Sequence, residues 1–300
     1  DRYIGWCEIG TGDEMVAVLG HLDVVPEGEG WHHPPYAAEI EGGRLYGRGS
    51  IDDKGPVVAS LFALKAIRDL GIPLNRRVRL LFGLNEETND RDVLYYKAHG
   101  GEIPVLGFTP DGEYPLINGE KGIINVTFSH ANVQTGDVRL LSIHGGTAPN
   151  VVPAHACAKL ACPRELAQRL ANLSAPQVRF TATDYGLFVE AEGESAHGST
   201  PELGKNAIGR LLLTLLQNHV AAVCMQLALD TLPLSVEVAN AVHFLAATLG
   251  METDGTSAGI ALHDAVSGGL TLNLGVINGD EHRLSLKINY RYPVTKGYAD

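Results

Sequence analysis

The sequence has few basic residues and no long apolar run. Lysine and arginine together number 23 against 35 aspartate and glutamate residues, so the formal net charge is −12. An acidic chain of this kind repels the phosphates of nucleic acids, and we expect no nucleic-acid partner. No apolar stretch approaches the roughly 20 residues that cross a bilayer, so we expect no membrane partner either.

Cysteine is scarce as well, with four scattered residues and no CxxC pair. This usage favours free thiols in a reducing compartment, and we expect a cytoplasmic protein. The chain does not open with methionine or a signal peptide, and its last residues, "NYRYPVTKGYAD", leave a strand-like run without a closing element. From these ends we expect a piece of a longer protein.

Strand-like and helix-like patterns alternate along the first 130 residues. Apolar runs indicate strands, and apolar residues at helical spacing indicate helices, at 15–19, 56–70, 78–84, 90–98 and 122–128. Strands and helices that alternate with short turns favour a mixed, mostly parallel sheet flanked by helices. We therefore expect an α/β catalytic domain over residues 1–130.

Residues 131–300 have a different pattern, which predicts a second, α+β domain. A helix is expected near 163–173, a hairpin turn at 184–186 and a long apolar helix over 207–229. Two strands close the chain, in "GLTLNLGVINGD" and "HRLSLKINYRY". We expect this domain to be a lid or a dimerisation-like domain.

The first strand ends in His21 and Asp23, which share one face because side chains alternate along a strand. A metal-bound imidazole usually has its other nitrogen held by a carboxylate or a carbonyl, which fixes the tautomer and the ring orientation. The pair therefore indicates a metal ligand with a carboxylate that orients it. The alternative is a capped strand end with a solvated aspartate.

Three further acidic clusters follow predicted strands or precede the first helix. Asp52 and Asp53 lie in "YGRGSIDDKGP", Glu86 and Glu87 in "FGLNEETND", and Asp111 in "TPDGEY". Singly, each has an ordinary alternative: a helix cap, a solvated pair, a turn residue. Together they surround the edge where open α/β sheets bind ligands, and one imidazole with several carboxylates suits Zn²⁺, with two ions favoured.

The motifs "GHLDVVPEGEGW", "LYGRGSIDDKGP", "NEETND" and "TPDGEYPLINGEKG", in this order, resemble the di-zinc aminoacylase/carboxypeptidase/dipeptidase family. Within that family the sequence is most similar to the bacterial PepV-type branch of carnosinase-like, Xaa-His dipeptidases, over nearly the whole chain. The family's final histidine ligand has no counterpart after Pro293. We expect that ligand beyond the C-terminus.

The resemblance implies a metal site with two zinc ions, for which manganese or cobalt could substitute. His21 and Asp111 would bind one ion, Asp52 would bridge the two ions, and Glu87 would bind the second ion. These four residues are the predicted metal ligands.

The resemblance also implies roles for five residues that bind no metal. Glu86 would be the general base for the metal-bridging water, and Asp23 would orient the imidazole. Asn150 in "GGTAPNVVP" and His197 in "GESAHGST" would stabilise the oxyanion, although a histidine beside glycine can be a plain turn residue. Arg291 would hold the terminal carboxylate of the substrate; the alternative is a buried strand-end arginine paired with an acid.

The leading prediction is a zinc dipeptidase that hydrolyses short, unblocked peptides. One alternative is an N-acyl amino acid deacylase, such as an aminoacylase or a desuccinylase, which performs the same amide hydrolysis. Another is a non-catalytic metal-binding homologue, against which the intact Glu86 argues. The PepV-type branch keeps a larger second domain as a lid, which favours a monomer, whereas most other relatives form homodimers.

Overall fold

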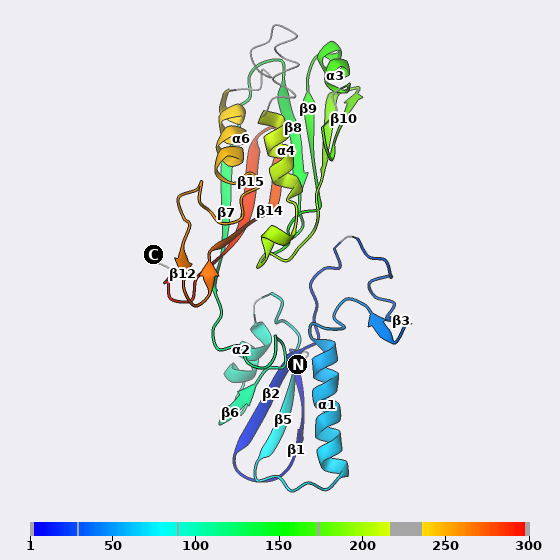
Figure 1. Ribbon diagram of the computed structural model, residues 1–300, viewed down its shortest axis with the longest axis vertical. Helices are drawn as coiled ribbons and strands as arrows, with labels where there is room; N and C mark the ends of the chain where they lie inside the picture. Colours follow the sequence, from blue (N-terminus) through cyan, green and yellow to red (C-terminus); the bar gives the residue numbers. More distant parts are fainter. Residues whose placement is uncertain (1–2, 29, 89, 173–174, 217–235, 298–300) are drawn as a thin grey trace. The chain divides into compact units, whose positions relative to one another are not determined.

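The computed structural model describes residues 3–28, 30–88, 90–172, 175–216 and 236–297. The chain divides into two units, Asp1–Asn118 and Gly119–Asp300 (Figure 1). The division falls ahead of the boundary near residue 130 that the sequence favoured. The reason is strand β7 (Gly122–Ala131), which pairs along its length with β15 (Arg283–Tyr292) of the second unit.

The first unit contains a four-stranded sheet whose strands lie in the order β1-β5-β2-β6. Strand β2 runs parallel to β5 and to β6, whereas β1 is antiparallel to β5, so the expected mixed, mostly parallel sheet is confirmed. The four strands are β1 (Ile4–Ile9), β2 (Met15–His21), β5 (Arg77–Gly83) and β6 (Leu106–Phe108).

Two helices pack on this sheet, α1 (Lys54–Asp69) on β2 and β5, and α2 (Arg91–Ala98) beside β1. Because side chains alternate along β2, its residues supply two separate apolar clusters. One contains Met15, Ala17 and Leu81 with Tyr96 of α2, and the other contains Val18, Leu64 and Leu80. A small ladder of β3 (Glu39–Glu41) and β4 (Arg44–Tyr46) lies between β2 and α1 in sequence.

The second unit is built on a seven-stranded sheet in the order β10-β11-β9-β8-β14-β15-β7, with every neighbouring pair antiparallel. Strands β10 and β11 form the hairpin expected at 184–186. Besides β7 and β15, the strands are β8 (Arg139–Gly145), β9 (His155–Ala161), β10 (Val178–Thr183), β11 (Gly186–Glu192) and β14 (Thr271–Asp280). A two-stranded ladder, β12 (His263–Asp264) with β13 (Gly268–Gly269), precedes β14.

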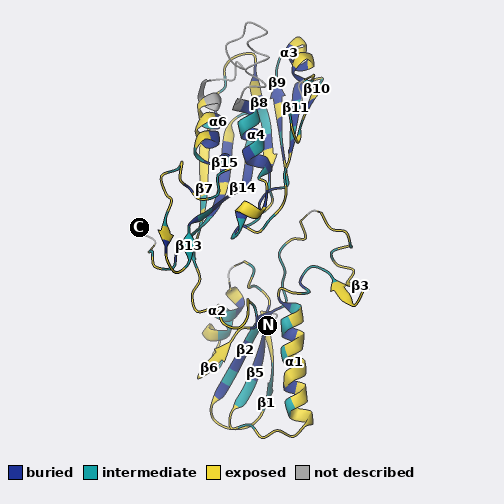
Figure 2. Ribbon diagram, in the orientation of Figure 1, coloured by how far each residue is buried: buried dark blue, intermediate teal, exposed yellow. Residues whose placement is uncertain are grey.

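Helix α4 (Ala207–Leu216) packs on β9, β11 and β14 and against α6 (Val236–Thr248), while α3 (Arg164–Leu170) packs on β10 and β11. One large apolar core fills the space between these helices and the sheet (Figure 2). The helix expected over 207–229 starts at Ala207, and its residues after 216 lie outside the described part. Among the described helices, none has the length and apolar character needed to span a membrane.

Candidate metal centre

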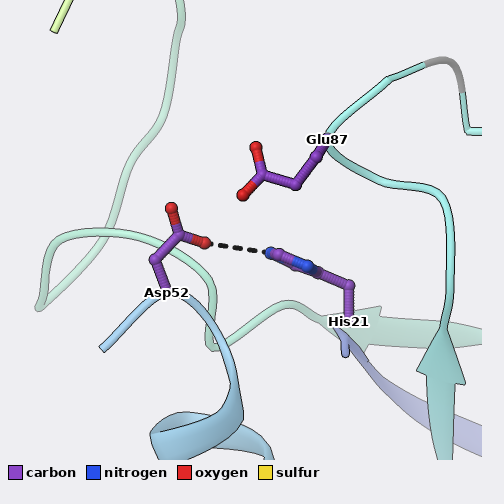
Figure 3. Close-up of side chains that lie close together, drawn as sticks. All are labelled: His21, Asp52 and Glu87. Carbon is purple, nitrogen blue, oxygen red and sulfur yellow. Dashed lines mark hydrogen bonds and ion pairs between the residues drawn. The ribbon is translucent and has the colours of Figure 1, made fainter. Parts of the chain in front are cut away.

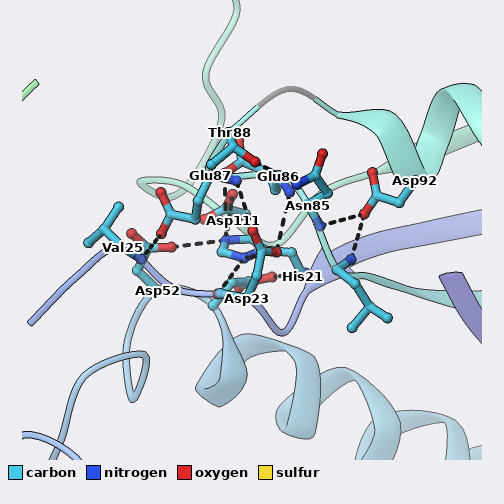
Figure 4. A network of polar contacts seen from close by, with 12 residues as sticks. His21, Asp23, Val25, Asp52, Asn85, Glu86, Glu87, Thr88, Asp92 and Asp111 are labelled. Atoms are coloured by element: carbon cyan, nitrogen blue, oxygen red, sulfur yellow. Dashed lines mark hydrogen bonds and ion pairs between the residues drawn. The ribbon is translucent and has the colours of Figure 1, made fainter. Parts of the chain in front are cut away.

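The strands of the first unit bring His21, Glu86, Glu87 and Asp111 to one edge of its sheet (Figure 4). His21 is the last residue of β2, Glu86 and Glu87 follow β5, and Asp111 follows β6. These three strands are parallel, so their carboxyl ends meet at the same edge. Asp52 joins them from the segment that precedes α1.

The imidazole of His21 is buried, and its two nitrogens face different groups. Nε2 lies 3.0 Å from Oδ1 of Asp52, 3.5 Å from Oδ2 of Asp111 and 3.9 Å from Oε2 of Glu86. Nδ1 lies 3.0 Å from the carbonyl oxygen of Asp23 and 3.3 Å from its Oδ1. With Nδ1–H donating to Asp23, Nε2 is the nitrogen presented to the carboxylates.

Ligand atoms gather closely enough to hold a metal ion. Those of His21, Asp52 and Glu87 all lie within 4.8 Å of one another (Figure 3), and so do those of His21, Asp53 and Asp111. The two groups contain all four predicted metal ligands and add Asp53. Imidazole nitrogen with carboxylate oxygen is a donor set that Zn²⁺ and related divalent ions accept, so these residues fit the implied metal.

The sequence did not decide whether Asp53 caps the following helix or binds a metal ion. It occupies the N-cap position of α1 without making a side-chain cap hydrogen bond. Instead, its fully buried carboxylate accepts a hydrogen bond from the backbone N–H of His21 at 3.1 Å. Asp53 therefore fixes the backbone at the end of β2, where His21 lies.

Burial and neighbouring carboxylates both raise the carboxyl pKa values at this edge. Desolvation raises the pKa of Glu86 to about 7, with Asp111 and Glu87 adding to the rise against the opposing effect of His21. Desolvation likewise raises the pKa of Asp53 to about 6 and that of Glu87 above its usual range. A bound divalent cation would relieve this repulsion.

The pKa of His21 reflects the same crowding. Burial alone would lower it, but the surrounding carboxylates, Asp111 and Glu86 foremost, outweigh burial and raise it above its ordinary value. Protons and metal ions therefore compete for this imidazole, since only its neutral form binds metal.

Asp23, which contacts the His21 ring, also binds the segment after β5 that carries Glu86 and Glu87. The backbone N–H of Glu86 donates to Oδ1 of Asp23 at 3.2 Å, and that of Glu87 donates to Oδ2 at 3.1 Å. Oε1 of Glu87 accepts from the backbone N–H of Val25 at 3.3 Å. The sequence pattern linked Asp23 to the imidazole alone and gave no sign of these backbone contacts.

Asn150 and His197 lie together within the second unit. The carbonyl oxygen of Asn150 accepts from the backbone N–H of Gly198 at 2.7 Å, and Val151 pairs with His197 as an isolated antiparallel bridge. Nδ1 of His197 lies 2.6 Å from Oγ of Ser199.

Asn273 of β14 holds the same segment and was not singled out from the sequence. Its buried Nδ2 donates to the carbonyl oxygens of Pro149 and Val151, both at 2.8 Å. The two residues that flank Asn150 are thus fixed by one carboxamide.

Arg291, on β15, is half-buried, and its Nε has no hydrogen-bond partner in the described part of the chain. Burial lowers the pKa of this guanidinium, and the nearby Glu120 acts against that change. No described acid forms an ion pair with Arg291.

Candidate metal ligands at the carboxyl edge of an α/β sheet, with an antiparallel α+β unit after them in the sequence, fit a metal-dependent hydrolase. The chain belongs to peptidase family M20/M25/M40, whose profile matches residues 17–268. Members of this family use divalent metal.

Relatives named as dipeptidases match nearly the whole chain. It is 38% identical to "Putative dipeptidase YtjP" of Bacillus subtilis (strain 168), over 98% of this chain and 62% of that protein. It is 35% identical to the Beta-Ala-Xaa dipeptidase of Lactobacillus delbrueckii subsp. lactis, over 97% of this chain and 61% of that protein. The crystal structure of human carnosine dipeptidase 1 is similar at a TM-score of 0.41 and 16% identity, over 99% of this chain and 57% of that one. The chain therefore spans about three fifths of the length of these relatives.

Proposed function

We propose that the protein is a metal-dependent dipeptidase that hydrolyses short, unblocked peptides. The observation that carries this proposal is the cluster of His21, Asp52, Glu87 and Asp111 with Glu86 beside it. Relatives named as dipeptidases match nearly the whole chain, which supports the same substrate class here. The binding partner that we propose for the protein is its substrate, a small peptide.

We propose two zinc ions at this site, with manganese or cobalt as substitutes. His21 and Asp111 would hold one ion, Glu87 would hold the other, and Asp52 would be shared between them. What the bound ions supply is Lewis acidity, which lowers the pKa of water and polarises a carbonyl oxygen.

Glu86 is proposed as the general base. Its Oε2 lies 3.9 Å from His21 Nε2, so it borders the ligand cluster without belonging to either ligand group, and a carboxylate in that place can exchange a proton with water held there. Its carboxylate would take a proton from the attacking water as the new C–O bond forms. It would then give that proton to the amine nitrogen as the C–N bond breaks.

The second unit would contribute to binding and to transition-state stabilisation. Asn150 and His197 are proposed hydrogen-bond donors to the oxyanion of the tetrahedral intermediate, a kind of contact whose loss typically costs about 10²–10³ in rate. Arg291 is proposed to bind the terminal carboxylate of the peptide, since its buried Nε lacks a partner among the described residues. We further propose a cytoplasmic monomer in which this unit acts as a lid.

A comparison of substrates tests the proposal. The full-length, metal-loaded protein is assayed with alanyl dipeptides and with N-acetyl amino acids, each beside the Glu86→Gln variant. Hydrolysis of the dipeptides alone supports the proposal, whereas hydrolysis of the N-acetyl amino acids alone would establish a deacylase. Metal binding without hydrolysis of either substrate would establish a non-catalytic homologue.

A further inference from the structure

Four consecutive backbone N–H groups after β5 are held by two carboxylates. Asp23 accepts from Glu86 and Glu87, as described above. Asp92, on α2, accepts from the two residues before them, Leu84 and Asn85 (Figure 4). We propose that Asp92 is a positioning residue that fixes the segment carrying the metal ligand Glu87 and the base Glu86. The proposal rests on the function proposed for those two glutamates.

The contacts of Asp92 are short and confined to backbone donors. Oδ2 accepts from Leu84 N–H at 2.5 Å and from Asn85 N–H at 2.9 Å, while Oδ1 accepts from Val93 N–H at 2.7 Å. The residue is fully buried, and no described cation forms an ion pair with it. A buried carboxylate without a cation is costly unless its oxygens are hydrogen-bonded, so these three donors are what make its burial tolerable.

A second link ties the same segment to the start of α2. Oδ1 of Asn85 accepts from the backbone N–H of Arg91 at 3.2 Å, and the carbonyl oxygen of Asn85 accepts from Asp90 N–H at 2.9 Å. The end of β5 and the start of α2 therefore each donate hydrogen bonds to the other and accept hydrogen bonds from it. A displacement of α2 would be transmitted to Glu86 and Glu87.

Gly83 makes room for the carboxylate. A Cβ at this position would lie 2.8 Å from Oδ2 of Asp92 and 3.3 Å from the carbonyl oxygen of Gly20. Any larger residue at position 83 would therefore displace Asp92 from the backbone groups that it binds.

An asparagine at position 92 would have nearly the same shape but only one accepting oxygen. Its NH₂ group would face either Val93 N–H or the pair Leu84 and Asn85, so at least one backbone donor would be opposed by another donor. Replacing a group that hydrogen-bonds directly to a metal ligand typically changes metal affinity or activity by about 10- to 100-fold, and we expect the same range for Asp92, which binds the backbone of the ligand-bearing segment.

The test compares Asp92→Asn with Asp264→Asn in the full-length protein. Asp264 is a matched control because its carboxylate also accepts from three backbone N–H groups, those of Val266, Ser267 and Thr295, but in the second unit. The readouts are zinc affinity, the visible absorption spectrum of bound Co²⁺, kcat and KM on an alanyl dipeptide, and Tm.

We expect Asp92→Asn to weaken zinc affinity and lower kcat about 10- to 100-fold, to change the Co²⁺ spectrum and to leave KM nearly unaltered. Asp264→Asn should lower Tm alone. Asp92→Asn protein that folds and retains wild-type zinc affinity, Co²⁺ spectrum and kcat would overturn the proposal. If the wild-type protein binds metal but cleaves no dipeptide, the proposed function fails, while zinc affinity and the Co²⁺ spectrum still decide the role of Asp92.

Two further measurements decide the question if Asp92→Asn does not fold. Gly83→Ala should change the Co²⁺ spectrum, because its Cβ would crowd Oδ2 of Asp92 (2.8 Å) more closely than Gly20 O (3.3 Å) or the Cβ of His21 (3.4 Å); an unchanged spectrum would contradict the proposal. In the wild-type protein, the Leu84 and Asn85 amides should exchange hydrogen slowly even after chelation of the metal. Exchange as fast as in an exposed loop would also contradict it.

Discussion

The two units hold the segments that carry the proposed site residues by different kinds of hydrogen bond. In the first unit, carboxylates accept hydrogen bonds from backbone N–H groups, and the apolar clusters beneath them are small. In the second unit, the neutral carboxamide of Asn273 donates to backbone carbonyls above one large apolar core. The stability of the first unit should therefore depend on charge, pH and bound metal. The stability of the second unit should depend mainly on apolar burial.

The largest effect is expected for Glu86→Gln. Loss of the proposed general base should lower kcat by about 10² to 10⁴, while metal binding should be retained because Glu86 is outside both ligand groups. Steady-state kinetics with metal analysis of the same preparation tests this. A variant that kept wild-type activity would refute the assignment of the base.

The next largest effect is expected for Asn273→Leu in the second unit. The substitution removes the donor to two carbonyl oxygens and should cost about 1–3 kcal/mol of unfolding free energy for each acceptor left unsatisfied. Chemical denaturation followed by far-UV circular dichroism measures the loss. Unchanged stability would show that the core alone fixes the segment around Asn150.

The stability of the metal-free first unit should depend on pH. In the first unit the folded-state pKa of Glu86 rises to about 7 and that of Asp53 to about 6. The folded state then binds more protons than the unfolded state between roughly pH 4 and 7, so stability should fall as pH rises through that window. The raised pKa of His21 acts in the same direction.

Tryptophan fluorescence isolates this pH effect, because the only two tryptophans, Trp6 and Trp31, both lie in the first unit. The denaturation midpoint that they report should be lower at pH 7.5 than at pH 5 after chelation. Saturation with zinc should reverse that order, because zinc binds the deprotonated ligands. A midpoint independent of pH would contradict the charge-dependent account of the first unit.

The smallest effect is expected for Asp264→Asn in the second unit. Hydrogen bonds from the backbone, those of Ser267 and Thr295 in particular, hold the pKa of Asp264 well below its usual range. The ionised carboxylate therefore stabilises the fold above the unfolded pKa of about 4, and this contribution fades as pH falls through and below that value. Circular dichroism should show a modestly lower Tm at pH 7 and a smaller difference at acidic pH, with tryptophan fluorescence unchanged.

Much of the candidate site could be predicted because strand ends are local features. His21, Glu86 and Asp111 each follow an apolar run, and parallel strands bring their ends to one edge. The partner of β7 could not be predicted in this way, because pairing with β15 joins residues far apart in the sequence. Asp92 was equally hidden, since an acid in the first turn of a helix is ordinary in any sequence.

The stretch between His21 and Asp52 has a consequence for engineering. It contains the exposed ladder of β3 and β4, and both of its ends are anchored, one on β2 and the other at the start of α1. Changes in the length of this ladder need not move His21 or Asp52, provided that Asp23 and Val25, which bind the segment of Glu86 and Glu87, are kept. The ladder is therefore the part of the first unit where a segment from another protein can be grafted while the proposed ligand set is kept.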